Sequence, residues 1–303
     1  MWFWNKKHTI AASGILQGAA DHHSHILPGV DDGVETMEES LHILGTYEEL
    51  GIKELWLTPH IMEDIPNTPE KLKARFVQLQ ATYNGNITLH LAAEYMIDNH
   101  LRKLLPNHSP SYVRGASNTV AEGDRTIIPL ETNNSPSLPR GTTRGSVVCD
   151  DGYFSTQKEC PIGATKGEGV ETNSLLPIGN SGKHILVETS YFNPPMRFKE
   201  TLRQIKSLGY YPLLAHPERY MYMDNDEYRR LREEGVKFQL NLASLAGGYG
   251  KAVKKKALWL LENGFYSVAG SDLHCEDAIE YITSCKLDEK SLMNVAQLLK
   301  NRI

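Results

Sequence analysis

The sequence predicts an α/β fold built on a parallel sheet, either doubly wound or closed as a barrel. Beyond residue 33, segments typical of buried strands alternate with segments typical of amphipathic helices, which is the order that a parallel sheet requires. The chain has 303 residues, a length at which α/β barrels often occur. Its predicted strands end on histidine, aspartate or glutamate, as strands do where a barrel forms an active site at its carboxyl-terminal face.

Capping residues and apolar spacing define the individual elements. Thr36 and Glu39 form a capping-box pattern that predicts the start of a helix, and Pro69 suits the first turn of the next one. Helices are expected at residues 36–51, 68–83, 197–209, 225–235, 251–264 and 289–301. Strands are expected at residues 52–61, 87–96, 184–192, 211–220, 237–245 and 265–274.

The composition is that of a globular enzyme and argues against several other classes. A net charge of −5 is unfavourable for a general nucleic-acid binder, which is usually basic. The four cysteines form no CxxC pair, which favours a reducing, cytoplasmic compartment. The first twenty residues are too polar for a transmembrane helix, so no direct membrane insertion is expected.

The stretch DHHSHILPGVDDG, residues 21–33, concentrates potential metal ligands near the amino terminus. His23 and His25 end a short first strand, and their i, i+2 spacing puts both imidazoles on one side of an extended chain. His22 points to the opposite side and is not expected to be a ligand. The later strands end on His60, Glu94, Glu188, His216, Asp272 and His274.

Taken together, these strand ends predict a polynuclear metal site. A single histidine at a strand end is more often structural, but several ionisable side chains that converge on one face require a counter-charge. Imidazole and carboxylate ligands without cysteine suit manganese, iron or zinc. Three other histidines, His42, His90 and His184, are expected to be structural.

Hydrolysis of a phosphate ester is the chemistry that such a site favours, because metal ions neutralise a phosphoryl group and activate water. Arg219, three residues after His216, is either a fork for the substrate phosphate or the ion-pair partner of a nearby acid. Asp21 either orients a histidine or only ends a loop. The sequence contains neither a C-x5-R loop nor a G-x-S-x-G elbow, so a cysteine or serine nucleophile is unsupported.

The motifs at these positions resemble those of a known superfamily. HSHILPGVDDG, TPHIMED, AAEYM, LVETSYFNPP, LLAHPERY, FQLNLASLAGGYG and GSDLH are similar, in this order, to the motifs of the PHP (polymerase and histidinol phosphatase) superfamily. Within it, the chain looks like the bacterial protein-tyrosine phosphatases of capsule and exopolysaccharide loci. The resemblance covers about residues 1–105 and 175–303. It implies a distorted (β/α)7 barrel, similar to a TIM barrel, with a trinuclear cluster that favours manganese.

The resemblance also implies a role for each ligand. One metal would be bound by His23, His25, Glu94 and Asp272. Glu94 would bridge to a second metal, which Glu188 and His216 would also bind. The third metal would be bound by Asp32, His60 and His274. Manganese is the expected ion, with iron or zinc as alternatives. Arg219 resembles the phosphate-binding arginine of the family, and the catalytic candidates are Arg219, Asp32 and His274.

The function implied by the resemblance is the removal of phosphate from protein tyrosines. The expected partner is the cytoplasmic tail of a membrane tyrosine autokinase that controls capsule and exopolysaccharide synthesis. Two alternatives remain open at this point. One is a small-molecule phosphatase, such as a histidinol phosphatase, with the same metals; the other is a non-catalytic module that docks a kinase.

Residues 106–174 are expected to be an insert, so that residues 1–105 and 175–303 form a discontinuous barrel. The segment is rich in Gly, Pro, Ser, Thr and Asn, which favours a flexible excursion over a small β module. A disulfide between Cys149 and Cys160 is not expected in the cytoplasm. Because the segment connects a helix to a strand, it would lie at the barrel face away from the ligands.

Overall fold

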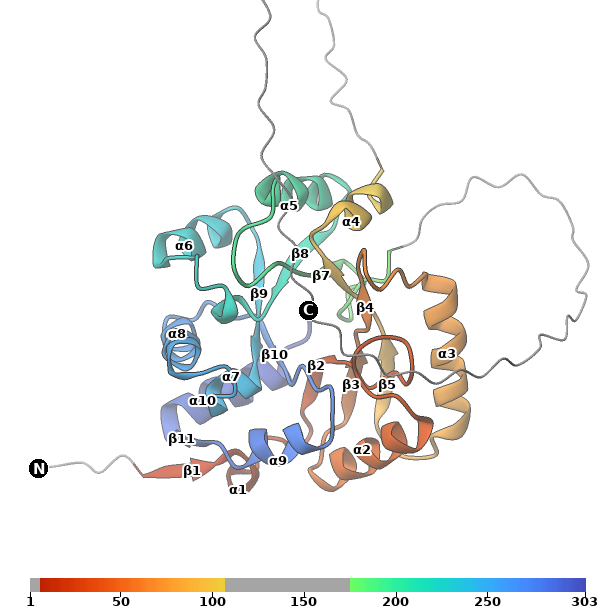
Figure 1. The fold of residues 1–303 in the computed structure, drawn as a ribbon. Coiled ribbons are helices and arrows are strands. Elements are labelled where there is room, and N and C mark those ends of the chain that lie inside the picture. Colours follow the sequence, from red (N-terminus) through yellow and green to blue (C-terminus); the bar gives the residue numbers. More distant parts are fainter. Residues whose placement is uncertain (1–5, 107–174) are drawn as a thin grey trace, which may run out of the picture. The chain divides into compact units, whose positions relative to one another are not determined.

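Parallel strands form the centre of the fold, and helices cover them (Figure 1). The computed structural model describes residues 6–106 and 175–303. The expectations for the segment 107–174, including its flexibility and the Cys149–Cys160 pair, lie outside the described residues. Among the helices that are described, none combines the length and the apolar composition needed to cross a bilayer.

The strands are β1 (Lys7–Thr9), β2 (Ala20–Ser24), β3 (Glu54–Leu57), β4 (His60–Ile61), β5 (Thr88–Leu91), β6 (Glu94–Met96), β7 (His184–Glu188), β8 (Tyr211–Ala215), β9 (Lys237–Asn241), β10 (Val268–Gly270) and β11 (Lys286–Asp288). The helices are α1 (Ile10–Ser13), α2 (Met37–Glu49), α3 (Pro69–Thr82), α4 (Asn99–Leu104), α5 (Phe198–Ser207), the 3-10 helix η1 (Pro217–Arg219), α6 (Asn225–Glu233), α7 (Leu242–Ala246), α8 (Lys251–Glu262), α9 (Asp277–Thr283) and α10 (Glu289–Lys300).

The predicted alternation of strands and helices is confirmed, but four predicted strands were too long, since those expected at 184–192 and 265–274 end at Glu188 and Gly270. The strands expected at 52–61 and 87–96 are each divided in two, as β3 with β4 and β5 with β6. The strand expected at 237–245 ends at Asn241, because the Asn241 side chain accepts a hydrogen bond from Ala243 N and caps α7. The strand expected at 211–220 ends at Ala215, because His216 adopts a left-handed conformation and η1 follows. The capping box of Thr36 and Glu39 is present at the start of α2, as predicted.

The strands form a curled parallel sheet. One group has the order β10-β9-β8-β7-β6-β4 and a second has the order β2-β3-β5. The groups meet where β3 runs into β4 and β5 into β6, with a hydrogen bond of 2.9 Å from Ala92 N to Leu57 O. On the far side of the curl, β10 lies against β2, and Asp272 N donates to His23 O over 2.8 Å. The short strands β1 and β11 form a separate antiparallel pair.

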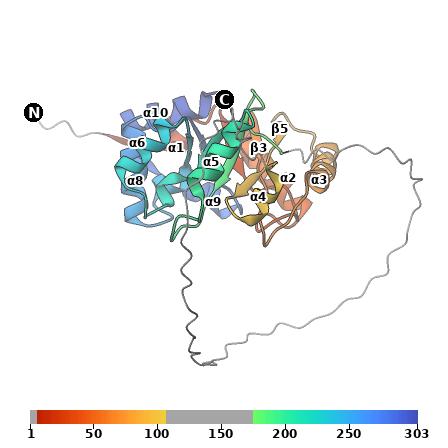
Figure 2. The same ribbon diagram turned by 90° about the horizontal axis from the view of Figure 1, so that it is seen from above.

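The core has two parts, one on each side of the curled sheet. The larger part lies between the sheet and the surrounding helices, which Figures 1 and 2 show on the outside of the strands. A smaller part is formed by Trp56, Ala92, Ile178, Leu186, Leu213, Ala215 and Val268. Leu186 shares its side of β7 with Glu188, since side chains two residues apart lie on one face of a strand. The smaller part therefore fills the inside of the curl below the strand ends.

Candidate metal centre

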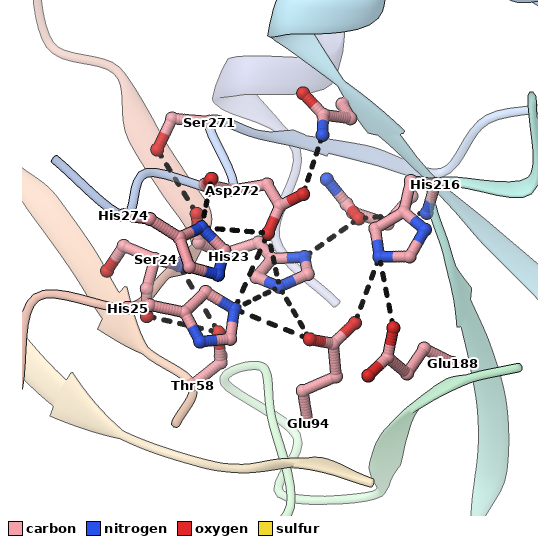
Figure 3. A network of polar contacts seen from close by, with 12 residues as sticks. His23, Ser24, His25, Thr58, Glu94, Glu188, His216, Ser271, Asp272 and His274 are labelled. Carbon is pink, nitrogen blue, oxygen red and sulfur yellow. Dashed lines mark hydrogen bonds and ion pairs between the residues drawn. The ribbon is translucent and has the colours of Figure 1, made fainter. Parts of the chain in front are cut away.

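The predicted ligands come together at the carboxyl ends of the parallel strands (Figure 3). His23 lies near the end of β2, Glu188 ends β7, and Asp272 follows β10. The side chains that the structure brings together are His23, His25, Asp32, His60, Glu94, Glu188, His216, Asp272 and His274. All but Asp32 and His274 are buried. The structure thus brings together the side chains of the several strand ends, with Asp32 from the turn after β2; that they bind metal stays a prediction.

Unusual backbone geometry brings these side chains into the site. His216 has φ 33° and Asp272 has φ 54°, both in the left-handed region, which costs about 1–3 kcal/mol for a residue with a Cβ atom. Gly270 is required next to them, because a Cβ atom there would lie 2.5 Å from His23 Cβ. The β10 strand can approach β2 closely only with glycine at this position.

His23 and His25 form the centre of the first group. Their Nε2 atoms lie 3.0 Å apart. Glu94 Oε2 is 3.1 Å from His23 Nε2 and 3.4 Å from His25 Nε2, and Asp272 Oδ1 is 3.4 Å from each. Two imidazole nitrogens and two carboxylate oxygens thus surround a single point, and all are fully or almost fully buried.

The hydrogen bonds behind these imidazoles fix their tautomers. Gln239 Oε1 accepts from the backbone N of His216 and so must also accept from His23 Nδ1, 3.1 Å away. Asp31 Oδ2 accepts from His25 Nδ1 over 2.8 Å and from the backbone N of His60 over 2.9 Å. Although burial opposes ionisation, the hydrogen bond and charge of His25 lower the pKa of Asp31 to about 2, so its carboxylate is ionised.

With both Nδ1 atoms donating, the two Nε2 atoms of neutral His23 and His25 point lone pairs at each other. Such an arrangement is repulsive unless a cation lies between the nitrogens. The surrounding donors, imidazole and carboxylate, are those that divalent manganese, iron and zinc accept. Ligating histidines commonly donate their other ring nitrogen to a carboxylate or carbonyl, as His25 and His23 do here. The residues therefore fit a metal ion.

Two further groups adjoin the first. His25, Asp32, His60 and His274 have ligand atoms within 4.8 Å of one another, and so do His60, Glu94 and Glu188. His216 Nε2 lies 3.2 Å from Glu94 Oε1 and 3.8 Å from Glu188 Oε2. Compared with the division implied by the resemblance, His25 also reaches the third group, and His60 also reaches the second. His60 Nδ1 is buried and makes no hydrogen bond within the described residues, although carboxylate oxygens of Glu94 and Glu188 lie 3.3 Å away.

The electrostatics of the cluster also require positive charge. Burial raises the pKa of Glu188 well above its usual range, and the negative charge of Glu94 raises it further. Burial lowers the pKa of His25, but the hydrogen bonds that His25 donates to Asp272 and Asp31 outweigh it and raise the pKa well above its usual value. The carboxylates thus favour the protonated forms of His23 and His25, and a metal ion would supply the same positive charge.

A cavity of about 510 Å³ opens above the cluster, and Arg219 forms part of its wall. Arg219 Nη1 lies 2.9 Å from Asp272 Oδ2. The guanidinium is held between the rings of Tyr191 and Tyr249, 4.1 Å from each ring centroid. Asn241 Nδ2 donates to the same Asp272 oxygen over 2.8 Å. Both interpretations of Arg219 agree with this geometry, since it pairs with an acid and also faces the cavity.

The side chains that were set aside lie apart from the cluster. His42 is exposed and pairs with Glu276, His90 stacks on Trp56 at 4.4 Å, and the His184 ring contacts Ser181. Asp21 orients no imidazole: its carboxylate accepts from the backbone N atoms of His23 and Ser271. Through these two hydrogen bonds the Asp21 carboxylate connects β2 to the end of β10.

Sequence reasoning missed four residues of the site. Tyr191 and Tyr249, which enclose Arg219, lie in loops; both stand in motifs of the resemblance, LVETSYFNPP and FQLNLASLAGGYG, but neither was assigned a role. Gln239, inside β9, has the pattern of an ordinary strand residue. A signal for Asp31 was present, because it adjoins Asp32 in the stretch DDG. Cys275, next to His274, also lines the cavity.

Comparison with known proteins assigns the chain to a family. A family model described as capsular polysaccharide synthesis, CpsB/CapC, matches residues 19–123 and 162–286. The chain belongs to the CpsB/CapC family. This confirms the resemblance to phosphatases of capsule loci that the motifs indicated.

Relatives in the CpsB/CapC family carry a specific activity in their names. Tyrosine-protein phosphatase YwqE of Bacillus subtilis (strain 168) is 24% identical over 261 residues, which cover 84% of this chain and 76% of the relative. Tyrosine-protein phosphatase CpsB of Streptococcus pneumoniae is 24% identical over 266 residues, covering 85% of this chain and 84% of the relative.

A solved structure has the same fold. It belongs to a crystallographic study of YwqE and CpsB, described there as unique metal-dependent tyrosine phosphatases. The alignment covers 92% of this chain and 93% of the solved chain, with a TM-score of 0.59 and 20% sequence identity. The curled α/β architecture of this CpsB/CapC chain is therefore that of the solved protein.

Proposed function

We propose that this chain is a metal-dependent protein-tyrosine phosphatase. The observation that carries the proposal is the pair of opposed Nε2 atoms of His23 and His25 among carboxylates, at the base of a cavity with Arg219 in its wall. The names of the relatives supply the substrate class, phosphotyrosine in proteins. The substrate we expect is the tail of a membrane tyrosine autokinase of a capsule or exopolysaccharide locus, reached from the cytoplasm.

The metal site has three positions in this proposal, with manganese as the first choice and iron or zinc as alternatives. Its ligands are His23, His25, Asp32, His60, Glu94, Glu188, His216, Asp272 and His274. When bound, divalent metals at such a site lower the pKa of water and neutralise phosphoryl charge. The fold around it is a distorted (β/α)7 barrel of the PHP type. The contact of β10 with β2 supports closure, through the bonds from Asp272 N to His23 O and from His25 N to Leu273 O, each 2.8 Å long.

The residues of the chain bind the substrate and handle its proton. Arg219 donates to the phosphate oxygens, because Asp272 and the two tyrosine rings hold its guanidinium in one plane and leave other N–H groups free for the cavity. Asp32 is exposed at the edge of the cavity, where it would hold a metal ion of the third position, and water held there would supply the proton that the leaving phenolate needs. His274 Nδ1 lies 2.9 Å from the backbone O of Asp272, which leaves His274 Nε2, 3.7 Å from Asp32 Oδ1, as the second ligand atom of that position.

We also propose that residues 106–174 are an insert that leaves the site assembled. Pro106 O accepts from Gln204, near the end of α5, and Ile178 bridges to His184 at the start of β7. Both ends of the segment thus leave the described chain near the amino ends of strands, away from the ligands. Deleting residues 107–173 should leave metal binding intact. Metal binding that appears only in the shortened protein would contradict the proposal.

Phosphate release from a phosphotyrosine peptide tests the function directly. The purified chain should release phosphate with manganese, lose the activity on chelation and regain it when manganese returns. Histidinol phosphate at the same metal loading should be a poor substrate. Faster turnover of histidinol phosphate would make the chain a small-molecule phosphatase. Bound metal without any turnover would favour a non-catalytic module that docks the kinase.

A further inference from the structure

Several exposed apolar side chains belong to the chain segments that border the cavity of the candidate metal centre. In the part of the chain that the structure describes, the two most exposed large apolar side chains are Met196, at 86%, and Phe192, at 84%. Both belong to the β7–α5 loop, residues 189–197. Met221 and Tyr249, also exposed, come from the segments that supply the cavity wall. Apolar groups concentrated in this way mark an interaction surface.

The β7–α5 loop is held at both ends. At its start, the backbone N of Thr189 donates to Tyr220 OH over 3.2 Å, and Tyr222 OH donates to Thr189 Oγ1 over 3.3 Å. At its end, Arg102 Nη1 donates to Met196 O over 3.0 Å. Two consecutive prolines at 194 and 195 restrict the backbone between these anchors. A loop fixed in this way loses little conformational entropy when it binds a partner.

The same loop reaches directly into the cavity. Tyr191 lines the cavity and stacks on Arg219, whereas the next residue, Phe192, is turned to solvent. A phosphate group bound at Arg219 therefore places whatever is attached to it beside this loop, which carries Phe192 directly after Tyr191 and Met196 near its end. A small phosphate ester ends inside the cavity and has no atoms to cover these side chains. A peptide continues beyond the phosphotyrosine and does.

We propose that the β7–α5 loop docks the residues flanking the phosphotyrosine of a protein substrate, through apolar contacts with Phe192 and Met196. This inference rests on the proposed phosphatase function. The ligand is an extended segment with apolar side chains close to the phosphotyrosine on either side. The loop thus selects a protein substrate, while Arg219 and the residues of the candidate metal centre act on the phosphoryl group.

Single substitutions in the loop test the inference. Phe192→Ser and Met196→Ser alter side chains that face solvent, so neither should affect folding. The substrates are a phosphotyrosine heptapeptide with leucine on both sides, the same peptide with serine there, and free phosphotyrosine. In each variant kcat/KM should fall about five- to tenfold for the leucine peptide and less than twofold for free phosphotyrosine. Met293→Ser, on α10 and 67% exposed, is the matched control and should change neither.

Three results would overturn the inference. The first is an unchanged kcat/KM for the leucine peptide in both loop variants. The second is an equal loss for free phosphotyrosine, which would mean that the loop supports the site and not the peptide. The third is a dimer in sedimentation that Phe192→Ser dissociates, because a second copy would then be the occupant. A wild type that hydrolyses nothing with manganese bound would instead remove the proposed function itself.

Discussion

Histidines at the strand ends and histidines earlier in the same strands have opposite surroundings. His23 and His25, at the end of β2, face the carboxylates of Glu94 and Asp272. His22, one residue before His23, is buried without a hydrogen-bond partner in the described residues. Along β7, too, the two ends differ: His184 begins the strand away from the metal centre, and Glu188 ends it at the metal centre.

Burial acts on both groups, and the converging carboxylates outweigh it at His23 and His25, whereas the pKa of His60 stays lowered, to about 4. Burial lowers the pKa of His22 to about 4 and that of His184 to about 4. For His23, burial also lowers the pKa, but the charges of Glu94 and Asp272 outweigh it and the pKa rises. Function therefore depends on the carboxylates that converge with the histidines, and a buried histidine alone is a structural residue.

Substitution of Glu94 should have the largest effect, because this carboxylate contacts imidazoles of all the metal groups. Glu94→Gln replaces a charged ligand by an amide and should lower metal content and reduce kcat/KM on the order of 10³-fold. His90→Gln, earlier in the adjoining strand β5, is the matched control and should change kcat/KM less than twofold. Elemental analysis and phosphate release measure both. Comparable losses of metal content and kcat/KM in the two variants would show that histidines inside the strands matter as much as the residues at the strand ends.

Asp31→Asn should have the next largest effect, although Asp31 is not expected to touch a metal. Asp31 Oδ2 accepts from His25 Nδ1 and from the backbone N of His60, and Asp31 Oδ1 accepts from the backbone N of Gly33. An asparagine amide has only one oxygen and cannot replace both carboxylate oxygens as acceptors. The tautomer of His25 is then no longer fixed, and manganese affinity should fall roughly 10- to 100-fold. Competition with a calibrated chelator measures the affinity. An unchanged affinity would show that Asp31 only shapes the turn.

Asp31 also shows where prediction from the sequence ends. The strand ends could be predicted because apolar runs that finish on His, Asp or Glu are visible in the chain, and a parallel sheet brings such ends together. Asp31 and Asp32 stand side by side in a turn, and the sequence does not show which carboxylate accepts from His25 Nδ1. Gln239 was equally hidden, since its role comes from contacts with His23 on β2 and His216 after β8, which are distant from it in the sequence.

The element boundaries that were wrong have a related cause. Residues 242–246 are apolar and continue the pattern of β9, but the cap formed by Asn241 turns them into α7. His216 ends β8 in a left-handed conformation that local propensity disfavours for histidine. Both deviations lie at the metal centre, where the packing of several strands overrides local preference.

Tyr191 offers a finer test of the strand-end region. Tyr191→Leu removes one of the two rings that enclose Arg219 and should raise KM for phosphotyrosine about tenfold with a smaller change in kcat. Tyr191→Phe keeps the ring and loses only the hydroxyl that donates to Glu188 Oε2 over 3.4 Å, so it should restore most of the affinity. A phenylalanine variant as impaired as the leucine variant would assign the role to the hydroxyl.

His184, at the amino end of β7, should affect acid stability and leave turnover unchanged. Its folded-state pKa is about 4, below the value of 6.5 that it has when unfolded, so the unfolded chain binds an extra proton between these pH values. The contribution is complete above pH 6.5 and is lost as the pH falls toward 4. Wild type should therefore lose about 1–2 kcal/mol more unfolding free energy than His184→Gln between pH 7 and pH 4.5. Denaturant titrations at both pH values measure the difference, and parallel curves for the two proteins would mean that His184 stays accessible to protons in the folded chain.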